Sequence, residues 1–158
     1  MKQNPVEAQV DTFLAKYSAE VSELLRAARA HLRAMFPQGC ELVFDNYNAL
    51  VFAISPSERA SEAFLSIAGY PRWVNLFFSH GAGMSDPDRL LQGSGSRVRS
   101  IRLQSAEHLL QPAIQALVVQ ALQPHREALL RAGSLQTTIK TASVKQRSRR
   151  PASGRAIS

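Results

Sequence analysis

Three arginines beside a glycine loop are the residues of this sequence best suited to binding an anion. The loop is residues 93–95 (Gly-Ser-Gly), and Arg97, Arg99 and Arg102 follow it. Backbone N–H groups of a glycine loop can hold a phosphate or carboxylate together with guanidinium groups. Phosphate-binding loops of nucleotide enzymes lead into a helix, however, whereas this loop leads into a predicted strand. A tight turn with solvent-exposed arginines is the competing interpretation, and the sequence favours it.

His80 and the acidic pair Asp86 and Asp88 are the next candidates, because histidine and carboxylate side chains can bind a metal or exchange protons. Pro87 follows Asp86, and this order is typical of the start of a helical turn. The other three histidines stand at no ligand spacing to one another. These residues therefore favour a structural turn over a metal or acid–base site.

Cys40 is the single cysteine of the chain, so the sequence offers neither a disulfide framework nor a cysteine-based metal site. A nucleophilic cysteine needs a neighbouring base, and the sequence places none beside it. We expect Cys40 to be a small buried hydrophobe. Because no nucleophile–base pair or pair of carboxylates stands out, a binding protein is favoured over an enzyme.

Polar and aromatic side chains gather around one predicted strand, residues 73–78. Its alternation places Asn75 between Trp73 and Phe77 on one face, while the opposite face is apolar. The mixed face indicates either ordinary pairing of Tyr and Trp polar atoms or the rim of a small pocket. The candidate ligand-binding residues taken from both regions are Tyr47, Arg72, Asn75, His80, Arg97 and Arg102.

Two helices are predicted ahead of these residues, and a third after them. Asn4-Pro5 is a helix start with an N-cap and a proline at the first position, and Ser18 can cap a second helix that Pro37 and Gly39 end. Pro112 begins the last helix, which we expect Pro124 to interrupt.

Between the helices the hydrophobic period changes to that of strands. Short apolar runs at 41–44, 49–54, 64–68 and 73–78 are separated by brief turn-forming clusters. Connections this short join antiparallel neighbours, so the pattern predicts a four-stranded meander. A fifth strand is expected to end at Leu103 and, because Val98 is out of step, to start near Ser100 or contain a bulge there.

Most of the net positive charge lies in the last 26 residues. The net charge is +7, and the segment 133–158 holds six of the nineteen basic residues and none of the twelve acidic ones. This segment shows no periodicity, so we expect a disordered basic tail after a domain at 1–132. Its cations could bind nucleic acid, although the segment has no aromatic residues to stack on bases. These cations are Lys140, Lys145, Arg147, Arg149, Arg150 and Arg155.

The predicted fold class is α+β: a five-stranded antiparallel sheet, made of a four-strand meander and a fifth strand after a crossover, with N- and C-terminal helices on one face. The sequence has no apolar run long enough to span a membrane and no pattern of a secretory signal, so the cytoplasm is the expected compartment. A homodimer would cover any apolar face that these helices leave open.

Several motifs resemble the YdhG-like family of small uncharacterised bacterial domains, one member of which is described as a frataxin-like iron chaperone. They include residues 41–51 (ELVFDNYNALV), 70–74 (YPRWV), 81–83 (GAG), 93–95 (GSG) and 98–103 (VRSIRL). The resemblance covers roughly residues 10–125 and implies an α+β fold with helices on one face of an antiparallel sheet.

The resemblance does not imply a defined activity, and iron is the only cofactor it suggests. The family pattern usually has a lysine after the second loop glycine, where this chain has Ser96, so Arg97 would have to supply any anion-binding role. An iron chaperone also needs an acidic surface. Here arginines offset the acids of the first two predicted helices, which gives a mixed-charge face.

The sequence therefore leaves three functional hypotheses. The first is a non-enzymatic domain that binds a small anion or an acidic partner at the 70–103 segment. The second is an iron-binding chaperone, by resemblance alone. The third is association with nucleic acid through the basic tail.

Overall fold

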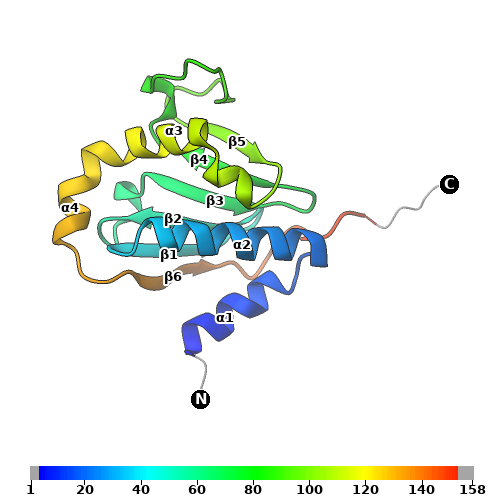
Figure 1. Ribbon diagram of the computed structural model, residues 1–158. Helices are drawn as coiled ribbons and strands as arrows, with labels where there is room; N and C mark the ends of the chain where they lie inside the picture. The colour runs from blue at the N-terminus through cyan, green and yellow to red at the C-terminus, as the bar shows by residue number, and fades with distance from the viewer. Residues whose placement is uncertain (1–3, 153–158) are drawn as a thin grey trace.

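The computed structural model describes residues 4–152 and places helices against one face of a six-stranded sheet (Figure 1). The α-helices are α1 (Pro5–Leu14), α2 (Ala19–Met35), α3 (Pro112–Leu122) and α4 (Arg126–Arg131). The strands are β1 (Cys40–Asp45), β2 (Leu50–Ser55), β3 (Leu65–Gly69), β4 (Val74–Phe78), β5 (Arg99–Leu103) and β6 (Gln136–Ala142). The α+β class is thus confirmed.

The predicted helix starts are confirmed by their caps. The Oδ1 atom of Asn4 accepts a hydrogen bond from the Val6 N–H at 2.8 Å, and the Oγ atom of Ser18 accepts one from the Val21 N–H at 3.3 Å. Each bond satisfies an N–H group that has no partner inside its helix. Pro124 interrupts the last helix as expected, because a short 3₁₀ turn at Gln123–His125 separates α3 from α4.

The meander is confirmed, and its order in the sheet is β5-β4-β3-β2-β1. Every neighbouring pair in this series is antiparallel, as the short connections predicted. β5 pairs in regular register with β4, beginning with Arg99 opposite Phe78. The late strand start was therefore the correct alternative to a bulge.

The basic tail departs from the expectation of disorder after residue 132. Residues Gln136–Ala142 form a sixth strand that pairs in parallel with β1, so the sheet is mixed rather than wholly antiparallel. A register shift between Val43 and Phe44 interrupts this pairing. The disorder predicted for 153–158, including the position of Arg155, lies outside the described residues.

A buried charge network helps to hold β6 beside β1. The carboxylate of Glu41 is fully buried and accepts hydrogen bonds from Arg29, Arg33 and the Thr137 hydroxyl. Arg29 also binds Glu7 through two bonds of 2.9 Å. The network therefore ties α1, α2, β1 and β6 together, which hydrophobic periodicity could not predict.

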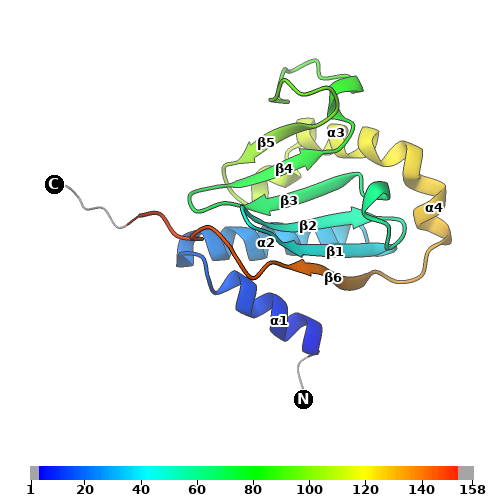
Figure 2. The ribbon, with the colours of Figure 1, turned by 180° about the vertical axis from the view of Figure 1, so that it is seen from behind.

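The sheet has one covered and one uncovered face. α2 and α3 lie on one side, and the view from behind shows the strands in front with no described helix across them (Figure 2). Val74, Leu76 and Phe78 of β4 point into the core beneath the helices and are fully buried, whereas Asn75 and Phe77 between them are half-buried. The alternation read from the sequence is confirmed on this strand.

The segment between β4 and β5 is a loop that is fastened to α3. Asp86 accepts hydrogen bonds from the N–H groups of Leu90 and Leu91, at 2.9 and 2.8 Å, and so closes the turn expected there. The side-chain amide of Gln120 binds both the N–H and the C=O of Ser85. These contacts favour the structural role proposed for Asp86.

Candidate functional site

A cleft of about 570 Å³ opens at the end of the sheet where the β3–β4 turn meets the C-terminal segment. We call it the basic cleft. Its lining residues are Asn48, Tyr70, Pro71, Arg72, Trp73, Arg147, Ser148, Arg150, Pro151 and Ala152. Positions about 75 residues apart in sequence therefore share one cavity.

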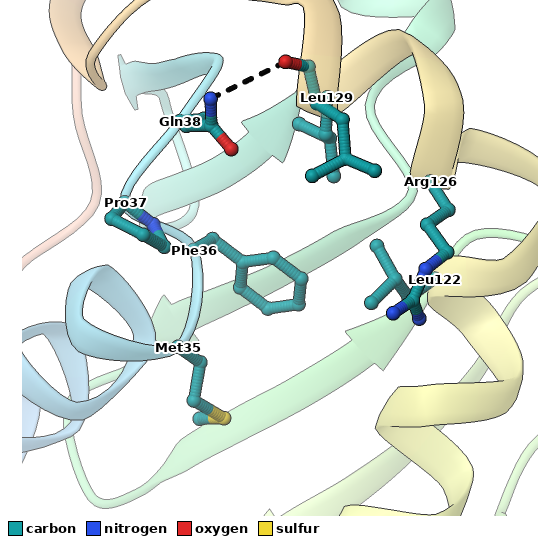
Figure 3. A pocket seen from close by; sticks show the side chains of 8 residues that line it. Met35, Phe36, Pro37, Gln38, Leu122, Arg126 and Leu129 are labelled. Atoms are coloured by element: carbon teal, nitrogen blue, oxygen red, sulfur yellow. Dashed lines mark hydrogen bonds between the residues drawn. The ribbon is translucent and has the colours of Figure 1, made fainter.

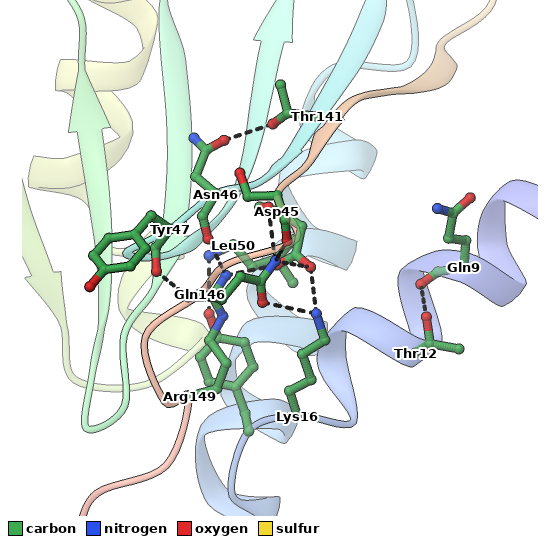
Figure 4. Close-up of polar contacts among 12 residues, drawn as sticks. Gln9, Thr12, Lys16, Asp45, Asn46, Tyr47, Leu50, Thr141, Gln146 and Arg149 are labelled. Atoms are coloured by element: carbon green, nitrogen blue, oxygen red, sulfur yellow. Dashed lines mark hydrogen bonds and ion pairs between the residues drawn. The ribbon is translucent and has the colours of Figure 1, made fainter.

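The C-terminal segment reaches the cleft because Asp45, at the end of β1, anchors it (Figure 4). The Oδ1 atom of Asp45 accepts from Arg149 Nη2 at 2.8 Å, and Oδ2 accepts from Lys16 Nζ at 2.7 Å and from Gln146 Nε2 at 2.9 Å. The carboxylate side chain is only 1% exposed. Such charge-assisted bonds are stronger than neutral ones.

Arg149 is the deepest contact of this segment and is 3% exposed. Its guanidinium donates to the backbone oxygens of Asn46 and Tyr47 and lies 5.8 Å from the centre of the Tyr17 ring. Its Nε atom is buried without a hydrogen-bond partner. The Arg149 contacts fix the backbone on either side, so Arg147 and Arg150 are held at the cleft.

Backbone and side-chain bonds fix these two flanking arginines further. The Arg147 N–H donates to the Tyr47 oxygen at 2.8 Å. The Arg150 guanidinium donates to the backbone oxygens of Lys16 and Ala15, at 3.1 and 3.3 Å. A ligand would therefore meet a largely formed wall rather than a disordered tail.

The basic cleft carries positive charge without carboxylates. Arg72, Arg147 and Arg150 are exposed, and no acidic side chain within the described range 4–152 lines the cavity. Among the described residues, none of the three forms an ion pair. A guanidinium offers five N–H donors in a planar fork that suits phosphate and carboxylate groups.

Two aromatic residues of the β3–β4 turn, Tyr70 and Trp73, also line the cleft. The rings of Tyr70 and Trp73 lie with centroids 6.2 Å apart, and the guanidinium of Arg102 lies 4.0 Å from the centre of the Trp73 ring. Burial raises the pKa of the Tyr70 phenol, which keeps it a neutral hydrogen-bond donor. The cleft thus combines cations with flat aromatic surfaces.

The predicted site residues divide between the two ends of the sheet. Arg72 lines the cleft, Arg102 stacks on its Trp73, and Tyr47 binds the C-terminal segment through its backbone oxygen. Asn75 lies opposite Arg102 in the sheet, and its Oδ1 atom is buried without a partner.

His80 and Arg97 lie at the other end, beyond the end of β4, where the Arg97 oxygen accepts from the Ala82 N–H. The six residues therefore do not converge on one site. The glycine loop at 93–95 belongs to this other end and takes no part in the basic cleft.

His80 borders a different cavity of about 420 Å³, which is lined mainly by apolar groups. There the His125 ring stacks on Phe64 at a centroid distance of 4.5 Å and lies 6.4 Å from the His80 ring. Burial lowers the pKa of His125, the nearby His80 lowers it further, and Glu62 acts in the opposite direction. This pair is better suited to packing than to binding a ligand.

Lowering the pH through the histidine range is expected to reduce stability through His125. A histidine whose pKa is lower in the folded state contributes fully above its unfolded pKa of about 6.5 and loses that contribution as the pH falls. His125→Phe keeps the stack on Phe64 and removes the titration. Denaturant unfolding at about pH 7.5 and 5.5 measures the free energy of unfolding, which should fall less for the variant than for the wild type as the pH is lowered. An equal fall in both proteins would show that His125 does not cause the pH dependence.

A third, smaller cavity of about 180 Å³ lies between the end of α2 and α4 (Figure 3). Its walls are mostly apolar, with Arg126 at the side and Gln38 bound to the backbone oxygens of Leu130 and Ala132. Figure 3 shows the Phe36 ring lying between Met35 and the side chains of Leu122 and Leu129. No polar groups converge there, so it gives no candidate for chemistry.

The described residues around these cavities offer neither a reactive cysteine nor a group of metal ligands. Burial raises the pKa of the half-buried Cys40 thiol, and Glu58 raises it further, so the thiolate is disfavoured. Within residues 4–152 no group of three or more His, Cys, Asp or Glu side chains is placed to hold a metal ion. No helix in this range is long and apolar enough to cross a membrane.

Neither a protein-family model, nor a curated protein, nor a solved structure matches the chain. The similarity to the YdhG-like family therefore stays an expectation drawn from its motifs.

Proposed function

We propose that this protein is a non-enzymatic binding domain and that it takes a ligand with phosphate or carboxylate groups in the basic cleft. The observation that carries the proposal is that Arg72, Arg147 and Arg150 meet around one cavity and have no carboxylate partner among the described residues. An anion placed among them would supply the charge partner that residues 4–152 do not.

Preorganisation supports this cleft over the glycine loop that the sequence suggested. Arg149 and Gln146 lock the C-terminal segment on Asp45, so less conformational entropy is lost when a ligand binds. Arg99, by contrast, donates to the backbone oxygens of Gly95 and Val98 and so supports its own loop. The anion-binding hypothesis therefore moves from the loop to the cleft.

Removing two cleft arginines is expected to abolish most of the anion affinity. Inorganic pyrophosphate and citrate should raise the melting temperature of the wild-type protein, because a ligand that binds only the folded state stabilises it. Each charge-assisted bond contributes about 1.5–3 kcal/mol, so Arg72→Ala with Arg147→Ala should weaken pyrophosphate binding at least tenfold in calorimetric titration.

The matched control removes two arginines at other surfaces. The side chains of Arg59 and Arg131 are 78% and 76% exposed and form ion pairs with Glu62 and Glu127. Arg59→Ala with Arg131→Ala changes the net charge equally but should leave pyrophosphate affinity unchanged. Equal weakening in both double variants would show non-specific attraction and contradict the proposal.

The iron hypothesis depends on the family resemblance alone, and we keep membership of the YdhG-like family as a proposal on the same basis. Anaerobic titration with ferrous iron tests it directly. The nucleic-acid hypothesis has gained a structural basis, because the arginines of the C-terminal segment now lie beside aromatic rings.

A further inference from the structure

We infer that the ligand class of the basic cleft is single-stranded nucleic acid, and that the strand continues from the cleft onto the uncovered face of the sheet. The inference rests on the proposed anion-binding function and names its ligand. It depends on three observations: where the carboxylates lie, where the aromatic rings lie, and how the cleft joins the face.

The uncovered face has no carboxylate on its strands. β1 supplies the acidic residues of the six strands, Glu41 and Asp45, and both are fully buried on the covered side in ion pairs with arginines. Successive side chains of a strand point to opposite faces, so the residues that alternate with Glu41, Val43 and Asp45 on β1, and their partners across the sheet, lie on the uncovered face. On β1 to β5, four members of that set are buried, namely Leu42, Ala53, Ser55 and Ala68. The members that a ligand can reach are the exposed Arg102 and the half-buried Cys40, Phe44, Val51, Ser66, Asn75, Phe77 and Ser100. A polyanion would meet no like charge on these strands.

Aromatic rings stand on this face at intervals. Phe77 lies on this face of β4, and Trp73, the residue directly before β4, lies on the same side because its ring contacts Arg102. At the usual rise of a strand the two positions are roughly 13 Å apart. Phe44 lies on the same face of β1. Phe44, Trp73 and Phe77 are half-buried, so part of each ring is open to a ligand. Bases stack on such rings with little sequence preference.

Small side chains lie beside Phe77, the serines half-buried and the alanines buried, so they do not project above the ring. Ala53, Ser66 and Ser100 lie in one cross-strand row with Phe77, and Ala68 lies in the next row beside Asn75. A flat base can lie over a ring in such a setting, as it does on open antiparallel sheets that bind single-stranded RNA. A duplex keeps its bases stacked inside and would offer these rings nothing.

Arg102 connects the face to the cleft. It belongs to the uncovered face of β5 and stacks on Trp73, which also lines the cleft beside Arg72. Phosphates could therefore pass from Arg147 and Arg150 to Arg72, while bases lie on Phe77 and against the stack of Trp73 and Arg102. This continuity of alternating cation and ring favours a strand of several nucleotides over a single small anion.

The test measures fluorescence anisotropy of a labelled twelve-residue oligothymidylate with the full chain. The expected result is saturable binding whose affinity falls with salt, with a logarithmic slope of about −2 to −3 for three or four arginine contacts. Phe44→Leu with Phe77→Leu keeps apolar side chains on the sheet but removes two stacking surfaces, and should weaken oligothymidylate binding at least tenfold. Pyrophosphate affinity of that variant should be unchanged.

Arg72→Ala should weaken both oligothymidylate and pyrophosphate, whereas Arg59→Ala should weaken neither. A twelve-base-pair duplex and a polyglutamate peptide are the competing probes. Equal binding of either one, or oligothymidylate binding that ignores the two phenylalanines, would overturn the inference. If the protein binds pyrophosphate but not oligothymidylate, the nucleic-acid inference is wrong and the proposed anion-binding function stands. If it binds neither probe, both the inference and the proposed function are wrong.

Discussion

Glu41→Ala is expected to lower the free energy of unfolding by about 3 kcal/mol, because breaking a buried ion pair leaves an uncompensated charge. Glu41 is fully buried and binds Arg29 twice, at 2.8 Å each, as well as Arg33 and Thr137. Arg29 itself is only 8% exposed, so its charge stays largely shielded from solvent when Glu41 is removed. We expect a loss at the lower end of the range of about 3–5 kcal/mol that is usual for a broken buried ion pair, because Glu7 still binds Arg29 in the variant.

Denaturant unfolding monitored by circular dichroism measures this loss. Glu127→Ala is the matched control, because its side chain is 87% exposed and pairs with Arg131 at 3.9 Å. Exposed pairs of this kind contribute little, so the control should unfold like the wild type. A Glu41 variant as stable as the control would show that the network contributes nothing to holding β6.

Asp45→Ala is expected to release the C-terminal segment and with it the anion affinity. Leaving Arg149 buried without its partner would cost about 3–5 kcal/mol, so the segment should undock instead. Trypsin should then cleave after Lys145, Arg147 and Arg149 at least tenfold faster, and pyrophosphate should bind at least tenfold more weakly. Asp88→Ala, at an exposed acidic residue, serves as control and should change neither.

The stability difference between the wild type and Asp45→Ala should disappear at acidic pH. Burial alone would raise the pKa of Asp45, but hydrogen bonds from Lys16, Gln146 and Arg149 outweigh it and hold the pKa below its usual value. A carboxylate of this kind stabilises the folded state above its unfolded pKa, about 3.9, and stops doing so as the pH falls through the lowered value. Wild type and Asp45→Ala should converge in that range; a gap that persists would contradict the charge-based anchor.

Much of the fold could be predicted from local patterns. The caps at Asn4 and Ser18, the meander and the break at Pro124 follow from residue types and spacing that act over a few positions. β6 could not be predicted in the same way. Its residues 136–139 (Gln-Thr-Thr-Ile) include three β-branched side chains, but its stability comes from Glu41 and the β1 backbone, about 95 residues away.

The candidate site was predicted only in part for a similar reason. Arg72 and Arg102 were identified from the segment around β4, and Arg147 and Arg150 from the charge of the tail. The sequence gives no sign that these two groups meet, because the contact depends on Asp45 and Arg149 across 104 positions. His80 and Arg97 were grouped with them by proximity in sequence, and β4 separates the two ends.

Titration of isotopically labelled protein with inorganic pyrophosphate, followed by nuclear magnetic resonance, tests the central claim most directly. The arginine Nε–H signals of Arg72, Arg147 and Arg150 and the backbone signals of residues 70–73 and 147–150 should shift in a saturable way, while those of residues 93–99 stay in place. Shifts confined to residues 93–99, or none that saturate, would contradict the account of the basic cleft.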